Sequence, residues 1–191
     1  MEAPAARDWE MRPRPEEGAV YREAAVLLLL YPRAGEDYVV FMRRPDTMEH
    51  HRGQISLPGG AQDPTDPDLI YTALREAHEE LGIDPDAVEV LGMLPEVYAR
   101  VSGFLITPVL GRLKPDAIAG EMVFKPNPHE VAEVIEVPLR ALNEASHRTE
   151  QRTHEGKAYN LHFYTYGPYE IWGATGRILH QFLSTPGRTE D

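Results

Sequence analysis

The segment from residue 66 to residue 82 restricts the fold more than any other, because it carries helix signals from beginning to end. Asp66 suits the N-cap, Pro67 occupies the favoured first helical position, and Asp68 adds an acid to the first turn. Gly82 suits the position just after a helix, where a left-handed backbone is usual. Apolar residues recur between these ends at helical spacing on one face: Ile70, Ala73, Leu74, Ala77 and Leu81. The sequence therefore predicts an amphipathic helix packed on a core.

The rest of the chain mixes strand and helix patterns. Bounded apolar or alternating runs predict strands at 24–30, 38–42, 54–57, 88–94, 103–110, 131–137 and 158–166. Short helices are predicted at 139–145 and 178–183, and the Gly59-Gly60 pair is predicted to form a turn. Because strands and helices do not alternate strictly, a mixed α/β (α+β) sandwich is favoured over a doubly wound sheet.

Composition excludes several classes of function. The 191 residues include 19 Lys and Arg against 31 Asp and Glu, a net charge of −12, which argues against non-specific nucleic acid binding. The chain has no cysteine, and therefore no disulfide, thiolate metal site or cysteine nucleophile. The longest apolar run, 24–30, is too short for a membrane span, and no secretory signal is visible at the N-terminus. A soluble, cytoplasmic protein with no membrane partner is expected.

Three acids of the predicted helix lie on one face. Glu76, Glu79 and Glu80 are related by three and four residues, and their face is centred about 120° from the apolar stripe. Like charges at this spacing repel, by roughly 0.2–0.5 kcal/mol per exposed pair. A bound Mg²⁺ or Mn²⁺ would reverse that repulsion, because hard cations prefer oxygen ligands. The alternative is an ordinary solvated acidic face, with Arg75 serving only as an ion-pair partner for Glu79.

The upstream Gly59-Gly60 pair favours the metal interpretation. Glycines let backbone approach a phosphate closely, or offer a carbonyl oxygen to a metal. A strand, a glycine pair, a polar loop and a helix with three acids together predict a metal-pyrophosphate site. In such a site the metal, and not the net charge of the chain, would attract an anionic ligand.

These residues resemble the Nudix box, Gly-x5-Glu-x7-Arg-Glu-U-x-Glu-Glu-x-Gly-U, where U is bulky and apolar. Gly60 opens the box here, and residues 75–83, Arg-Glu-Ala-His-Glu-Glu-Leu-Gly-Ile, close it. Two features depart from the pattern: Asp66 replaces the first Glu with eight residues before Arg75, and the small Ala77 stands at a U position. The resemblance implies a Nudix-like α/β/α sandwich with a mixed β-sheet and a metal-dependent pyrophosphohydrolase.

The upstream segment is similar to a motif of the coenzyme A pyrophosphatase subfamily. That motif reads Arg-Ser-x-x-Leu-x-x-His-x-Gly-Gln-U-x-Phe-Pro-Gly-Gly, and the matching positions here are Arg44, His51, Gly53, Gln54, Pro58, Gly59 and Gly60. Pro45, Met48 and Leu57 depart from it. Segments 102–109, 126–133 and 171–179 also resemble the subfamily, so the resemblance covers roughly residues 24–183. It implies hydrolysis of coenzyme A to 3′,5′-ADP and 4′-phosphopantetheine.

The resemblance also implies roles for individual residues. Glu76, Glu79 and Glu80 would hold Mg²⁺ or Mn²⁺ with a backbone carbonyl of Gly60 or Gly59, and Arg75 would orient the glutamates. Glu76 would act as ligand, as general base, or as both in turn. The general base outside the box would be Glu130, with Glu133 second and Glu121 third. The residues expected to bind substrate are Arg44, His51, Gly59 and Arg100, with Arg43 and Arg52 as further cations.

Several alternatives stay open at this point. One is a Nudix pyrophosphatase for ADP-ribose or another nucleoside diphosphate derivative, and another is a non-catalytic Nudix-fold binding or regulatory module. The expected organisation is an N-terminal arm (1–18), one Nudix domain (19–184) and a C-terminal tail (185–191). The expected partner is a small nucleotide substrate. The oligomeric state is open, with a homodimer among the alternatives.

Overall fold

The computed structural model describes residues 20–33, 35–46, 53–100, 102–115, 124–154 and 157–185. The predicted arm at 1–18 lies outside them, as does nearly all of the predicted tail. The helices are α1 (Leu69–Leu81) and α2 (Gly173–Leu183), with 3₁₀ turns η1 (Pro85–Ala87), η3 (Leu139–Ala141) and η4 (Glu144–Ser146). The strands are β1 (Arg22–Arg33), β2 (Glu36–Arg43), β3 (Ile55–Ser56), β4 (Gly59–Ala61), β5 (Val88–Met93), β6 (Val97–Ala99), β7 (Phe104–Leu113), β8 (Glu133–Pro138), β9 (His147–His154), β10 (Lys157–Tyr166) and β11 (Tyr169–Ile171).

The larger sheet is mixed and is centred on β1. Strand β1 pairs parallel with β7 and antiparallel with β2, and the order along the main path is β3-β2-β1-β7-β5. The first part of β1 also pairs antiparallel with β4, which brings residues 59–61 beside residues 24–26. The second sheet has the order β11-β10-β9. This mixed arrangement confirms the predicted α/β (α+β) class.

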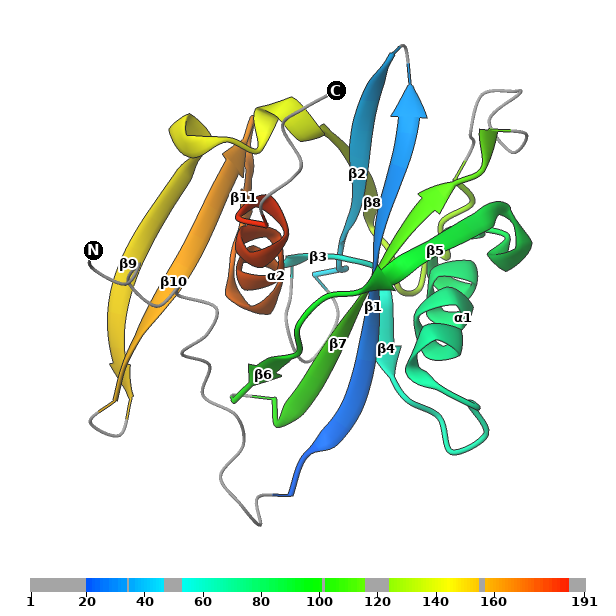
Figure 1. The fold of residues 1–191 in the computed structure, drawn as a ribbon, viewed down its shortest axis with the longest axis horizontal. Helices are drawn as coiled ribbons and strands as arrows, with labels where there is room; N and C mark the ends of the chain where they lie inside the picture. Colours follow the sequence, from blue (N-terminus) through cyan, green and yellow to red (C-terminus); the bar gives the residue numbers. More distant parts are fainter. Residues whose placement is uncertain are drawn as a thin grey trace, which may run out of the picture.

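The two helices lie on opposite sides of the larger sheet (Figure 1). Helix α1 packs on one face, where Leu27 and Leu29 of β1 meet Ala73, Ala77 and Leu81 in one buried cluster. The buried apolar residues of α1 belong to the predicted stripe, whereas the helix also buries Thr72 and Glu80, which lie outside it. None of the helices among the described residues is long and apolar enough to cross a membrane.

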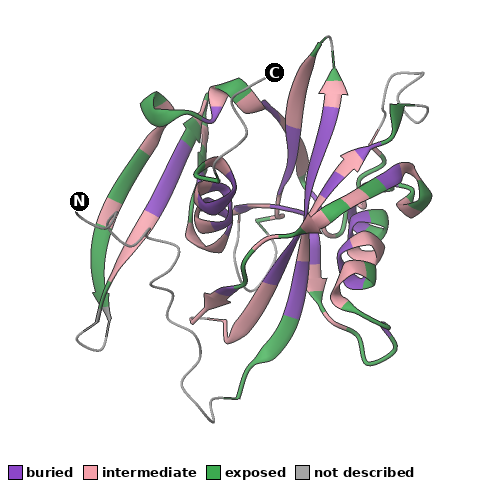
Figure 2. Ribbon diagram, in the orientation of Figure 1, coloured by how far each residue is buried: buried purple, intermediate pink, exposed green. Residues whose placement is uncertain are grey.

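Helix α2 lies between the larger sheet and the second sheet (Figure 1). Neighbouring residues of β1, Leu28 and Leu30, join Ile178, Leu179 and Phe182 of α2 in a second buried cluster. Successive residues of β1 therefore serve different cores, as expected for a strand that is covered on both faces. Figure 2 shows the continuous buried stretch along this central strand.

Three local predictions are wrong. Residues 139–145 do not form one helix, because Asn143 interrupts the segment and caps the separate 3₁₀ turn η4 through its side chain. Gly59 and Gly60 lie in strand β4 instead of a turn, because β1 supplies their hydrogen-bonding partner. The N-cap of α1 is Asp68 and not Asp66, because the Asp68 carboxylate accepts a hydrogen bond from the Tyr71 amide at 2.7 Å.

Candidate active site

Asp66 has a different role from the one predicted. Its side chain is 1% exposed and forms two hydrogen bonds of 3.0 Å with the guanidinium of Arg75. It also accepts hydrogen bonds from the Thr72 hydroxyl at 2.9 Å and the Asp63 amide at 3.0 Å. The hydrogen bond from Arg75 holds the pKa of the Asp66 carboxyl at about 2. Asp66 thus anchors the loop before α1 to the first half of the helix.

The other guanidinium contacts of Arg75 reach the acids of the box. Its Nη1 atom lies 2.8 Å from Glu76 Oε1 and 3.1 Å from Glu79 Oε2. A planar guanidinium held at one edge by a carboxylate presents its remaining nitrogens in fixed directions. Arg75 thus contacts both Glu76 and Glu79 while the Asp66 carboxylate holds the other edge of its guanidinium.

Glu80 is the most buried of the three glutamates. It is 3% exposed, and its Oε2 atom accepts a hydrogen bond of 2.8 Å from the Gly59 amide. Burial raises the pKa of the Glu80 carboxyl to about 8, in spite of that hydrogen bond and of the nearby positive charge of Arg44. A buried carboxylate with so little compensation is a costly arrangement unless a cation balances it.

Glu76 lies beside the second glycine of β4. Burial also raises the pKa of the Glu76 carboxyl, although its ion pair with Arg75 opposes the effect. A methyl group at Gly60 would lie 2.7 Å from the Glu76 carboxylate, closer than van der Waals contact allows. A methyl group at Gly59 would lie 2.3 Å from the Ala25 carbonyl oxygen. The two glycines therefore have different roles. Gly59 allows β4 to pack closely against β1, and Gly60 leaves room for the Glu76 carboxylate.

Glu130 is brought to the acids by the loop that precedes β8. The Asn127 amide donates to the Glu80 carbonyl oxygen at 2.8 Å, and the Glu130 amide donates to the Asn127 carbonyl oxygen at 3.0 Å. The negative charge of Glu130 contributes to the raised pKa values of both Glu76 and Glu80. The predicted general base thus lies within electrostatic reach of Glu76 and Glu80.

The remaining predicted residues lie in varied places. Glu133 accepts hydrogen bonds from the Tyr169 hydroxyl at 2.5 Å and from Arg43 at 3.2 Å, which lower the pKa of its carboxyl and hold it in a structural contact. Arg44 acts electrostatically on Glu80, whereas Arg100 lies in the turn after β6. His51, Arg52 and Glu121 lie outside the described residues.

The donor set fits a hard divalent cation. Glu80 is buried and Glu76 is half-buried, burial raises the pKa of both carboxyl groups, and the absence of a Cβ at Gly60 leaves space beside Glu76. Glu79 is less closely placed, with a side chain that is 52% exposed and ion-paired to Arg75. Glu76 and Glu80 would therefore form the inner part of a metal site, with Glu79 at its edge.

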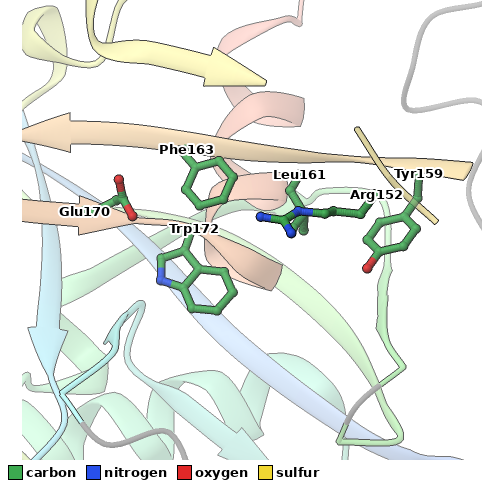
Figure 3. Close-up of a pocket in the computed structure, with 6 residues that line it drawn as sticks. All are labelled: Arg152, Tyr159, Leu161, Phe163, Glu170 and Trp172. Atoms are coloured by element: carbon green, nitrogen blue, oxygen red, sulfur yellow. The ribbon is translucent and has the colours of Figure 1, made fainter. Parts of the chain in front are cut away.

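A separate pocket lies on the second sheet (Figure 3). Its lining residues come from β9, β10 and β11 and from the N-cap of α2: Arg152, Tyr159, Leu161, Phe163, Glu170 and Trp172. The Phe163 and Trp172 rings stack with centroids 6.0 Å apart. No residue of this lining was predicted from the sequence as a site residue, and the pocket is not formed by α1.

Comparisons with known proteins show the family to which this chain belongs. The family model described as the NUDIX domain matches residues 21–155. An uncharacterized Nudix hydrolase, NudL, from Photorhabdus laumondii is 39% identical over 161 residues, which cover 84% of this chain and 82% of the relative. The NudL protein of Enterobacter sp. is 36% identical over 172 residues, covering 90% and 86%. The chain belongs to the Nudix hydrolase family and is a pyrophosphohydrolase, and such enzymes generally use divalent metal ions.

Solved structures show the same architecture. A Nudix hydrolase from M. smegmatis, RenU, is 27% identical with a TM-score of 0.51, and the match covers 63% of this chain and 73% of that one. A MutT/nudix family protein from Enterococcus faecalis is 18% identical with a TM-score of 0.57, covering 92% and 65%. The second likeness concerns the fold alone.

Proposed function

We propose that this Nudix hydrolase cleaves the pyrophosphate bond of coenzyme A, with Mg²⁺ or Mn²⁺ as cofactor. Water attacks phosphorus, the bridging P–O bond breaks, and the products are 3′,5′-ADP and 4′-phosphopantetheine. The observation that carries the proposal is the position of the segment resembling the coenzyme A motif. Its first residue, Arg44, acts electrostatically on Glu80, and its last residue, Gly60, lies beside Glu76.

The two ends of that segment are joined by backbone contacts. The Arg44 amide donates to the Gln54 carbonyl oxygen at 3.0 Å, and β3 pairs with the end of β2. Gly53 has a φ of +63°, and a methyl group there would lie 2.8 Å from the Asp46 carboxylate. Arg44 and Gly59 are therefore proposed to bind the pyrophosphate end of the substrate, together with His51 and Arg100 from the sequence motif.

The proposal assigns a separate role to each of the acids. Glu76, Glu79, Glu80 and the Gly60 carbonyl would hold the metal. When bound, the metal would lower the pKa of a coordinated water and offset negative charge on the pyrophosphate oxygens. Arg75 keeps Glu76 and Glu79 oriented through its contact with Asp66. Glu130 would accept the proton of the attacking water, because its charge lies within electrostatic reach of both Glu76 and Glu80.

Product analysis tests the substrate and the bond together. Purified protein is incubated with coenzyme A and Mg²⁺ or Mn²⁺ in H₂¹⁸O, and the products are analysed by mass spectrometry. The expected products are 3′,5′-ADP and 4′-phosphopantetheine, with one ¹⁸O on a phosphate. A parallel panel contains ADP-ribose and other nucleoside diphosphate derivatives. A clear preference for ADP-ribose would contradict the coenzyme A assignment while leaving the pyrophosphohydrolase class unchanged.

The organisation of the chain follows the same proposal. We place one catalytic domain at residues 19–184, with an N-terminal arm before it and a short tail after it. The family match over 21–155 and the end of α2 at Leu183 support these limits. The cytoplasm is the proposed location, because a chain without cysteine suits a reducing compartment.

A further inference from the structure

Three histidines meet on the side of the molecule that carries α2. His147 begins β9, His162 lies in β10 and His180 lies near the end of α2. One ring nitrogen from each lies within 4.8 Å of the others, and this is the only such group of three candidate metal ligands in the described part of the chain. His147 Nε2 and His162 Nδ1 are 3.0 Å apart. These residues are not part of the Nudix box, and no motif links them in the sequence.

The fold brings the three imidazoles together through strand pairing and close helix packing. His147 lies opposite Tyr164 in the β9–β10 pair, and His162 lies opposite Thr149, so these side chains share the face that α2 covers. Gly176 allows the helix to approach, because a methyl group there would lie 2.2 Å from the His162 carbonyl oxygen. The ring centroids of His162 and His180 are 3.7 Å apart as a result.

The chemistry of the group differs from that of the Nudix acids. Neutral imidazole is a good ligand for Zn²⁺ and neighbouring transition metals, whereas Mg²⁺ and Mn²⁺ prefer carboxylate oxygens. Burial lowers the pKa of His147, which favours the neutral, ligating form. His162 is 5% exposed, while His147 and His180 are half-buried, so the group has both an inner ligand and an approach from outside.

The distances are within reach of a tetrahedral site. Metal–nitrogen bonds of about 2.0–2.1 Å place two ligand nitrogens roughly 3.4 Å apart around tetrahedral Zn²⁺. The observed distances lie on both sides of that value. The His147 and His162 nitrogens are 3.0 Å apart, and the ligand nitrogens of all three histidines lie within 4.8 Å of one another. Rotation about the terminal side-chain bonds would turn the stacked rings so that their lone pairs converge, and water would complete the coordination.

We propose that His147, His162 and His180 form a second metal site, which takes a borderline divalent cation such as Zn²⁺. The bound cation joins the β9–β10 hairpin to α2, and it lies on the opposite side of the larger sheet from the box acids. The role of this site is structural: it fixes α2 between the two sheets. The proposal does not depend on the substrate of the enzyme.

Cobalt provides a direct test. Tag-free protein carrying Glu80→Gln, which weakens the carboxylate site, is stripped with a chelator and titrated with Co²⁺. We expect one equivalent to give the intense visible absorption of tetrahedral Co²⁺, and Zn²⁺ but not Mg²⁺ to displace it. His147→Asn and His180→Asn, each checked for folding by circular dichroism, should weaken binding at least tenfold. Equal binding in these variants, or no tetrahedral spectrum, would overturn the proposal.

A second measurement needs no substitution. Histidines of the unmodified chain are labelled with diethyl pyrocarbonate and mapped by mass spectrometry. Zn²⁺ should protect His147 and His180, while the exposed His129 serves as the internal reference. Mg²⁺ should protect none of them. Labelling of His147 and His180 that is the same with and without saturating Zn²⁺ would reject the site even if the variants failed to fold.

Discussion

The guanidinium of Arg75 forms two hydrogen bonds of 3.0 Å with the carboxylate of Asp66, nine residues earlier in the chain. The same guanidinium contacts Glu76 at 2.8 Å and Glu79 at 3.1 Å. One arginine thus connects a buried structural acid with two acids of the proposed metal site. Substitutions of Asp66 should therefore affect the rate of hydrolysis, although Asp66 itself contacts neither metal nor substrate in this proposal.

Replacement of Arg75 by Lys should lower kcat while the chain stays folded. Lysine keeps the positive charge but cannot bind Asp66 with two nitrogens and still reach Glu76 and Glu79. We expect a loss of about tenfold to hundredfold, equivalent to roughly 1.4–2.8 kcal/mol in the barrier. Steady-state kinetics measure it. The matched control is Arg112→Lys. Arg112 lies on β7 and forms an ion pair of 2.8 Å with Asp37, so its replacement should change kcat little. Equal losses of kcat in both variants would contradict the orienting role of Arg75.

Asp66→Asn should change how the free energy of unfolding depends on pH at acid pH. The hydrogen bond from Arg75 lowers the folded pKa of Asp66 to about 2, below its ordinary value of 3.8. The stability it contributes is therefore present above pH 3.8 and is lost as the pH falls through about 2. Urea unfolding of metal-free protein between pH 5 and pH 2 should show a shallower decline in the variant. Parallel curves for the two proteins would show that this carboxyl is not linked to unfolding.

Gly60→Ala should damage the site more than the fold. The added methyl group would displace the Glu76 carboxylate, which lies 2.7 Å away, whereas the Gly60 backbone is one that alanine can adopt. Metal affinity and kcat should fall, with thermal unfolding changed only slightly. Gly59→Ala is the contrast, because its methyl group would meet the Ala25 carbonyl oxygen and should destabilise the fold. A Gly60→Ala enzyme with normal metal affinity would count against the proposed role of Glu76.

Glu80→Gln should stabilise the metal-free protein and remove most of its activity. Glutamine can still accept the hydrogen bond from the Gly59 amide, but it avoids the cost of a buried charge. We expect a gain of about 1–3 kcal/mol in the free energy of unfolding without metal, and a loss of at least about a hundredfold in kcat. Glu89→Gln, on the exposed side of β5, is the control for removing a charge. Full turnover by the Glu80 variant would place the metal elsewhere.

Glu130→Gln should slow the reaction while leaving metal binding intact. A general base contributes about 10²–10⁴-fold to rate, so a loss within this range is expected. Isothermal titration with Mn²⁺ reports the metal affinity separately. Glu133→Gln provides the comparison: that carboxylate is bound by Tyr169 and Arg43, so its loss should lower stability more than rate. The opposite result would assign the base to Glu133.

Much of this arrangement could be predicted from the sequence where the signals are local. The apolar stripe of α1, its end at Gly82 and the central strands all follow from spacing and from turn residues. The N-cap is different, because an acid before a proline, such as Asp66, fits the N-cap position by sequence as well as Asp68 does. Only the three-dimensional structure shows that the Asp66 carboxylate binds the Arg75 guanidinium, while the Asp68 side chain caps the helix.

Features that depend on distant segments could not be predicted. Strand β4 forms because β1 lies beside it, and strand β9 is a run of polar and charged residues with no apolar alternation. In place of apolar contacts, β9 forms ion pairs such as the one between Arg148 and Glu170. The histidine group likewise arises from β9, β10 and α2 together, and no spacing rule connects its members.

The alternation along β1 has a consequence for tolerance to change. Leu27 and Leu29 belong to the core under α1, whereas Leu28 and Leu30 belong to the core under α2. An inserted or deleted residue here would exchange the two sets and send each leucine to the wrong side. Such a change would also shift Ala25 and Val26 away from the glycines of β4. Substitutions among similar apolar residues should be accepted in this strand, but a change of its length should not.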